Sequence, residues 1–138
     1  MIRLLVADDH GIIREGLARL FATVPDVEVV GLAADGREAI ALADETSPDV
    51  VLMDVVMPHV DGLEAARRIA AAHPASRIIM LTGYDDQAIV REALRAGATG
   101  YVLKHSGADQ VVRAVRVPHA AVTVPGLAGG APSDMASS

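Results

Sequence analysis

Short apolar runs alternate with helical patterns along most of the chain. The runs are too short for helices and lie at residues 2–7, 27–33, 50–53, 77–81 and 100–103. Between them, apolar residues recur every three or four positions, which is typical of amphipathic helices. We expect these helices at residues 11–24, from around 39–43 to the Ser47-Pro48 break, from 62 to the His73-Pro74 break, at 87–96 and at 107–116.

Strict alternation of strands and helices predicts an α/β fold with a parallel, doubly wound sheet. Right-handed crossovers favour a flavodoxin-like (βα)5 domain with strand order 2-1-3-4-5 and helices on both faces, which makes three layers. Gly97 and Gly100 precede or begin the last strand, and we expect both to have positive φ angles.

Composition narrows the class of protein. A chain of 138 residues suits one domain with a full core. Cysteine is absent, so nothing points to a disulfide-bonded secreted protein. No apolar run approaches the ~20 residues that a membrane-spanning helix needs, and we expect a cytoplasmic protein without membrane contact. The net charge of −6 disfavours binding of this chain to a nucleic-acid backbone.

The third apolar run ends in a single carboxylate. Residues 50–53 lead into Asp54, and Pro48 and Pro58 bound the stretch. So short a run reads as a strand buried on both faces of a parallel sheet. Asp54 then lies at the carboxyl end of that strand, where open α/β sheets place their chemistry. The alternative is that Asp54 only ends the strand and caps a turn.

Polar residues end four of the five predicted strands. Asp8 and Asp9 follow the first, Asp54 the third, Thr82 the fourth and Lys104 the fifth. With the first strand beside the third, the three carboxylates converge and repel one another, which a divalent cation such as Mg²⁺ relieves. The hydroxyl and ammonium groups suit the oxygens of a phosphoryl group, and a carboxylate can itself form an acyl phosphate.

Each of these residues also has an ordinary structural interpretation. Asp8 and Asp9 could cap the following helix, Thr82 could be a turn residue, and Lys104 could be a solvated lysine. The joint pattern at the ends of the expected strands argues against coincidence. None of the five histidines, His10 included, shows the spacing of metal ligands.

These residues resemble the response-regulator receiver domain of two-component signalling. The resemblance covers residues 1–116. It rests on Asp8-Asp9, on Asp54 followed by Met57-Pro58 and Asp61-Gly62, on Leu81-Thr82-Gly83 and on Gly100-Tyr101-Val102-Leu103-Lys104. Asp8-Asp9-His10 followed by Arg14, Gly16 and Leu17 is similar to the NarL/FixJ (LuxR-type) branch.

The resemblance implies a role for each site residue. Asp54 would accept a phosphoryl group from the phosphohistidine of a sensor histidine kinase. Asp9 and Asp54 would bind Mg²⁺ directly and Asp8 through water, and the backbone carbonyl of Val56 would be a further ligand. Thr82 and Lys104 would contact the phosphoryl oxygens.

The resemblance also assigns a switch. Thr82 and Tyr101 would form it, the hydroxyl moving towards the phosphate while the ring turns inward. The alternative for Tyr101 is a half-buried strand aromatic. Val56 and Tyr84 occupy the positions that tune loss of phosphate in the family. An apolar side chain and a bulky ring there would hinder the attacking water, so we expect a long-lived acyl phosphate.

The end of the chain changes character. Residues 117–138 are rich in Pro, Gly, Ala and Ser, and we expect a flexible tail or linker after a receiver domain at 1–116. A short ordered element around 120–124 is the alternative. No DNA-binding helix pair is recognisable there. Control of transcription would therefore need a DNA-binding domain absent from this chain, and the alternative is a stand-alone receiver that acts through protein contacts, such as a homodimer formed on phosphorylation.

Three rival functions remain. An aspartyl-phosphate hydrolase would resemble Asp-x-Asp-x-Thr, but Val56 stands where the second Asp should be. A flavodoxin-type flavin binder needs a phosphate loop after the first strand, where Asp8 and Asp9 would repel phosphate. A phosphate-independent scaffold would not need the five site residues, all of which are present. We therefore expect a regulatory phospho-acceptor rather than an enzyme.

Overall fold

Five parallel strands form the centre of the molecule. The structure is a computed structural model that describes residues 1–57, 60–83 and 87–116. The sheet order is β2-β1-β3-β4-β5, which confirms the predicted order. The strands are β1 (Ile2–Ala7), β2 (Val27–Ala33), β3 (Val50–Asp54), β4 (Arg77–Thr82) and β5 (Gly100–Leu103).

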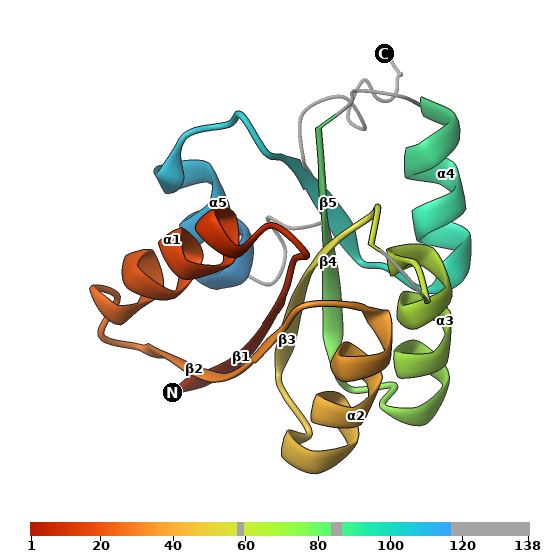
Figure 1. Cartoon of the computed structure of the whole chain (residues 1–138), viewed down its shortest axis with the longest axis horizontal. Coiled ribbons are helices and arrows are strands. Elements are labelled where there is room, and N and C mark those ends of the chain that lie inside the picture. The colour runs from red at the N-terminus through yellow and green to blue at the C-terminus, as the bar shows by residue number, and fades with distance from the viewer. Residues whose placement is uncertain (58–59, 84–86, 117–138) are drawn as a thin grey trace.

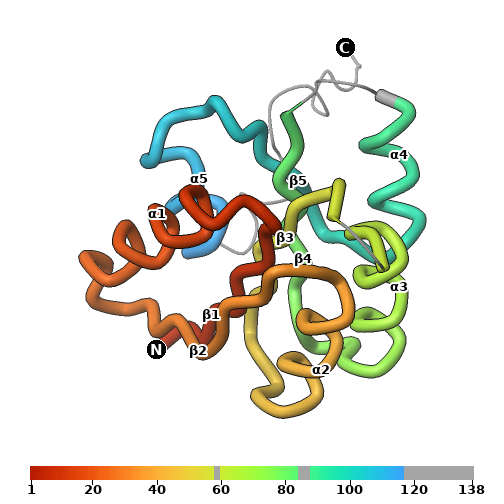
Figure 2. The backbone as a smooth tube through the Cα atoms, in the orientation of Figure 1, coloured from red at the N-terminus to blue at the C-terminus, as the bar shows by residue number. Residues whose placement is uncertain are grey.

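Helices cover both faces of the sheet and give the expected three layers. Figures 1 and 2 show α1 and α5 on one face and α2, α3 and α4 on the other. The helices are α1 (Gly11–Ala22), α2 (Gly36–Thr46), α3 (Gly62–Ala72), α4 (Gln87–Ala96) and α5 (Ala108–Arg116).

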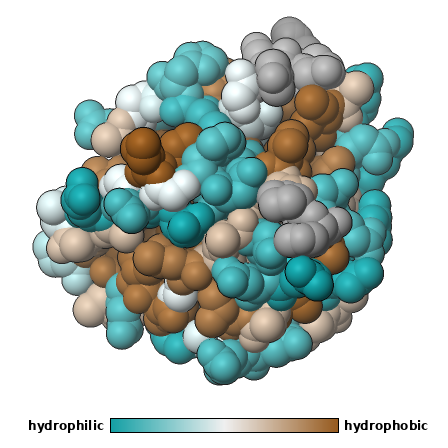
Figure 3. Space-filling model, viewed as in Figure 1, coloured by the Kyte–Doolittle hydropathy of each residue, from teal (hydrophilic) through white to brown (hydrophobic). Residues whose placement is uncertain are grey.

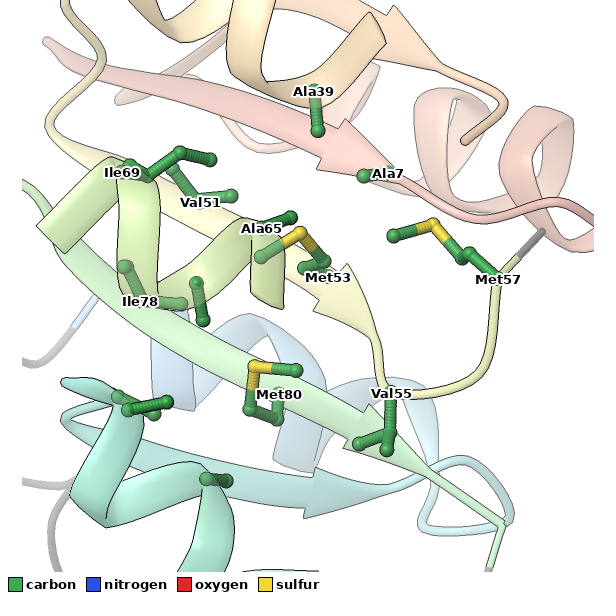
Figure 4. Packing of buried hydrophobic residues seen from close by; sticks show 14 of the residues in the cluster. Ala7, Ala39, Val51, Met53, Val55, Met57, Ala65, Ile69, Ile78 and Met80 are labelled. Carbon is green, nitrogen blue, oxygen red and sulfur yellow. The ribbon is translucent and has the colours of Figure 1, made fainter. Parts of the chain in front are cut away.

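The alternation of side chains along the strands divides the core in two. On β3, Val51 and Met53 pack with the cluster under α2, α3 and α4, while Val50 and Leu52 pack with the cluster under α1 and α5. Figure 4 shows Met53 on the first side, close to Ala65 of α3. The core is almost entirely aliphatic because the chain has few aromatic residues to bury.

Several element ends differ from the prediction by one or two residues. β3 and β4 each extend one residue further, to Asp54 and Thr82, because the ladder continues through the Asp54–Leu81 and Thr82–Leu103 pairs. Helix α1 ends two residues early, at Ala22. Helices α2 and α3 begin with Asp-x-x-Glu caps, in which the aspartate side chain accepts the N–H of Glu38 or Glu64.

The prediction of positive φ was right for Gly97 and wrong for Gly100. Gly97 has φ of +113° and is the only such glycine in the described part of the chain. It ends α4 with hydrogen bonds from its own N–H to Leu94 and from the N–H of Ala98 to Ala93, both to backbone carbonyls. The N–H of Thr99 then pairs with Ile78 of β4, so the turn is complete before Gly100.

Apolar side chains also reach the surface, where they interrupt the polar areas of the face in Figure 3. The most exposed large ones are Met1, Ile12 and Val56. In the described ranges, no helix is both long and apolar enough to cross a membrane. The predicted tail at 117–138 and Tyr84 lie outside the described residues.

Gly62 provides a test of how tightly the loop after β3 packs. A Cβ on Gly62 would lie 2.0 Å from the carbonyl oxygen of Asp54, whereas a Cβ on Gly16 of α1 would meet nothing within 4 Å. We expect Gly62→Ala to lower the free energy of unfolding by about 1–3 kcal/mol or more. Gly16→Ala should raise it by about 0.5–1 kcal/mol, because alanine favours a helix interior. Urea unfolding measures both, and equal effects of the two variants would contradict the packing described.

Candidate functional site

The predicted polar residues gather at the carboxyl edge of the sheet. Asp8 follows β1, Asp54 and Thr82 are the last residues of β3 and β4, and Lys104 follows β5. The parallel register brings these strand ends level with one another. One pocket at this edge is lined by Asp9, His10, Asp54, Val55, Val56, Thr82, Gly83, Ile89 and Lys104.

Lys104 connects two of the carboxylates. Its Nζ donates a hydrogen bond of 2.9 Å to Oδ2 of Asp54 and lies 3.4 Å from Oδ2 of Asp8. Its backbone N–H donates to the carbonyl of Thr82 at 2.8 Å, which fixes the start of the loop after β5. Lys104 is thus an internal cation of the cluster, and its interpretation as a solvated lysine is wrong.

Asp8 is fully buried, with none of its surface exposed. Its Oδ1 accepts the backbone N–H of His10 at 2.9 Å. A guanidinium nitrogen of Arg14, on α1, donates to the backbone carbonyl of Asp8 at 2.6 Å. The cap of α1 is His10, and no side chain makes a capping bond there, so the interpretation of Asp8 and Asp9 as helix caps is wrong.

One oxygen of this buried carboxylate has no hydrogen-bond partner among the described residues. That atom is Oδ2 of Asp8, whose neighbour is the ammonium of Lys104 at 3.4 Å. A buried oxygen without a hydrogen bond is costly unless another group binds it. The donor chemistry of this cluster therefore fits a cation with a preference for oxygen.

Burial and like charge disturb the titration of Asp54. Burial raises the pKa of its carboxyl group, the hydrogen bond from Lys104 opposes that rise, and the charge of Asp8 adds to it. For Lys104, burial acts to lower the pKa, but the hydrogen bond and charge of Asp54, together with Asp8, raise it overall. The two acidic side chains thus hold the ammonium charged, while the carboxylate of Asp54 is less stable than in water.

Thr82 and Tyr101 are both buried, with Thr82 3% and Tyr101 2% exposed. The interpretation of Tyr101 as a half-buried aromatic is therefore wrong. Its side chain belongs to the cluster under α2, α3 and α4 because β5 presents it to that face.

Val56 is 66% exposed, and its backbone N–H donates to Oδ1 of Asp54 at 3.3 Å.

His10 is the residue that sequence reasoning missed. Its Nδ1 lies 3.2 Å from Oδ1 of Asp8 and 3.3 Å from Oδ1 of Asp9. Together with Asp54, these side chains offer ligand atoms that all lie within 4.8 Å of one another. The signal was its place directly after two acidic residues, and not a spacing to another histidine.

Comparison with known proteins identifies the family. A model of the response regulator receiver domain matches residues 4–116. The chain belongs to this family. It is a family of regulatory phospho-acceptors rather than enzymes, and the acidic pocket of Asp8, Asp9, Asp54 and Lys104 is the site typical of it.

The similar proteins include transcriptional regulators of the NarL/LuxR type. The chain is 46% identical to the transcriptional regulatory protein LiaR of Bacillus subtilis (strain 168), over 84% of this chain and 55% of the relative. It is 45% identical to the uncharacterized transcriptional regulatory protein YhcZ of the same organism, over 84% and 54%. The chain thus spans about half the length of these curated relatives.

Solved structures agree with this assignment. A LuxR-family two-component response regulator from Aurantimonas sp. SI85-9A1 superimposes with a TM-score of 0.88 at 37% identity and covers 99% of both chains. The receiver domain of the putative response regulator NarL from Mycobacterium tuberculosis gives 0.79 at 38% identity, covering 83% of this chain and 92% of that one.

The raised pKa of Asp54 leads to a prediction about stability. Above the folded pKa of Asp54, its ionised form lowers the stability of the fold, whereas below the unfolded value of 3.8 the group is protonated in both states and has no effect. We expect Asp54→Asn to be more stable than the unchanged protein at pH 7 without divalent metal. This gain should shrink as the pH falls towards 3.8.

Thermal unfolding between pH 4 and pH 8 measures this difference. Asp61→Asn is a matched control, because it removes an exposed carboxylate from the same edge of the sheet and keeps a side chain that can cap α3. A stability difference for Asp54→Asn that stays constant across this pH range would contradict the assigned burial cost.

Proposed function

We propose that this receiver is switched by Mg²⁺-dependent phosphorylation of Asp54. The observation that carries the proposal is the carboxylate of Asp54, which lies in a pocket beside a second buried carboxylate and 2.9 Å from a lysine ammonium. A buried, poorly stabilised carboxylate next to a cation is a nucleophile whose product, an acyl phosphate, keeps the cation paired.

The phosphoryl donor is the phosphohistidine of a sensor histidine kinase. A carboxylate oxygen of Asp54 attacks phosphorus, a P–O bond forms and the P–N bond breaks. The bonding electron pair returns to the imidazole nitrogen of the kinase. The N–H of Val56 and the ammonium of Lys104, which hold the two oxygens of Asp54, orient the carboxylate for this step.

The acidic residues would hold the metal ion. Asp9 and Asp54 would be direct ligands, and Asp8 would bind through a water molecule. The backbone carbonyl of Val56 would be a further ligand. Oδ2 of Asp8 lies 3.4 Å from the ammonium of Lys104 but accepts no hydrogen bond among the described residues, which supports this assignment. When bound, Mg²⁺ supplies positive charge that offsets the carboxylates and the transferred phosphoryl oxygens.

Lys104 and Thr82 would bind the new phosphoryl group. The Nζ of Lys104 is already hydrogen-bonded to the acceptor and needs little movement to reach an oxygen on it. Thr82 lines the same pocket and brings a hydroxyl donor. Thr82 and Tyr101 would form the switch, and the buried ring in this structure corresponds to the inward position that the proposal gives to the phosphorylated form.

The output would be control of transcription. LiaR and YhcZ are named as transcriptional regulators and are nearly twice as long as the matched segment. We therefore propose that a DNA-binding domain of the full-length regulator delivers the signal in the cytoplasm. The alternative is a receiver that acts through protein contacts, including a homodimer formed on phosphorylation.

Native mass spectrometry with Mg²⁺ and acetyl phosphate tests the acceptor. We expect one added phosphoryl group on the unchanged chain and on Asp61→Asn, and none on Asp54→Asn. Removal of Mg²⁺ with a chelator should prevent the gain. A phosphoryl group on Asp54→Asn, or none on the unchanged chain, would contradict the proposal. A dimer in the phosphorylated sample would support self-association as output.

The lifetime of the acyl phosphate tests Val56. Its apolar side chain stands two residues after the acceptor and is mostly exposed, where it can neither bind nor orient a water molecule. An amide there could do so, and we expect phosphorylated Val56→Asn to lose its phosphoryl group severalfold faster. Mass spectrometry over time measures the loss of the phosphoryl group from both proteins. Equal lifetimes, or a longer lifetime for the variant, would contradict the hypothesis.

A further inference from the structure

The imidazole of His10 lies against the acidic cluster and not against its own helix. His10 occupies the cap position of α1, yet its side chain makes no capping hydrogen bond. Its Nδ1 is instead 3.2 Å from Asp8, 3.3 Å from Asp9 and 4.0 Å from Asp54, each measured to a carboxylate oxygen. The ring thus faces three acidic residues that come from two strands.

These separations match those between ligands of one ion. First-row divalent metals bind nitrogen and oxygen at about 2.0–2.1 Å, so neighbouring ligands of an octahedron lie about 3 Å apart and opposite ligands about 4.2 Å apart. The distance from His10 to Asp9, a direct ligand in the proposed site, is close to the first value, and the distance to Asp54, the other direct ligand, is close to the second.

A second, independent observation points to a ligand at this place. Asp8 is fully buried, and its Oδ2 has no hydrogen-bond partner among the described residues. Its neighbour is the ammonium of Lys104 at 3.4 Å, so this oxygen can still accept a hydrogen bond from a metal-bound water. His10, with 61% of its side chain exposed, faces the cluster from the solvent side, where an ion would enter.

We propose that His10 gives the acidic cluster a nitrogen ligand, so that the site prefers Co²⁺ and Ni²⁺ to Mg²⁺ more strongly than an all-oxygen site would. Imidazole suits the later first-row metals, whereas Mg²⁺ selects oxygen, and affinity rises from Mn²⁺ to Ni²⁺. The inference deepens the proposed function, because it rests on the same metal site and concerns which ion that site takes.

Calorimetric titration of the full chain with Ni²⁺ and with Mg²⁺ tests the ligand. We expect His10→Ala to weaken Ni²⁺ binding by about tenfold or more and to leave Mg²⁺ binding unchanged. His73→Ala is the matched control, because His73 also contacts a carboxylate, Asp44 at 2.8 Å, but lies away from the cluster. This variant measures how much Ni²⁺ binds to histidines outside the cluster, and it should leave Ni²⁺ binding at the cluster unchanged.

Co²⁺ gives a second readout. Its visible absorption changes when a nitrogen ligand is replaced by oxygen, so the spectrum of the Co²⁺-loaded chain should shift in His10→Ala and not in His73→Ala. Equal Ni²⁺ affinity in the unchanged chain and His10→Ala would overturn the inference. Tighter Ni²⁺ binding by the variant, or parallel losses for Ni²⁺ and Mg²⁺, would do the same.

Phosphorylation of the same preparations separates the two proposals. If Mg²⁺ and acetyl phosphate still modify Asp54 while the Ni²⁺ results go against His10, only the nitrogen ligand is rejected. If the unchanged chain neither binds Mg²⁺ nor accepts a phosphoryl group, the proposed function itself fails.

Discussion

Two buried carboxylates beside a single ammonium are the constraint on which this structure depends. Asp8 and Asp54 are almost completely enclosed, and Lys104 reaches both of them. A charge in a protein interior is costly unless it is paired and hydrogen-bonded, and here one cation serves two anions. The site is therefore short of positive charge, which is the property that a metal ion and a phosphoryl-transfer site require.

The rest of the fold holds this charge imbalance in place. Parallel register brings the ends of β1, β3, β4 and β5 to one edge, and aliphatic clusters on both faces of the sheet fix that register. Arg14 and the close approach of Gly62 to the carbonyl of Asp54 fix the backbone on either side of the pocket. Burial of apolar side chains offsets the unfavourable electrostatics of the site.

Much of the site could be predicted because strand ends are visible in the sequence. An apolar run that stops at Asp8, Asp54, Thr82 or Lys104 indicates both a strand and the position of its carboxyl end. The predicted strand order then places these ends close together. Met53 and Met80 lie inside two of these apolar runs, and both are buried.

Features that depend on three-dimensional packing could not be predicted in this way. Whether Tyr101 is buried depends on α3 and α4 covering that face, and Gly100 needs no special φ because the turn is completed at Gly97. The place of His10 depends on how the chain leaves β1, and a search for spacing between histidines cannot detect a ligand whose partners are the adjacent aspartates.

Unfolding at increasing Mg²⁺ concentration tests whether the carboxylate cluster lacks positive charge that a metal ion provides. We expect the free energy of unfolding at pH 7 to rise with Mg²⁺, by about 2.7 kcal/mol at a concentration one hundred times the dissociation constant. The rise should be much smaller in Asp8→Asn. If Mg²⁺ did not change the stability of the protein without substitutions, the carboxylate cluster would not lack positive charge.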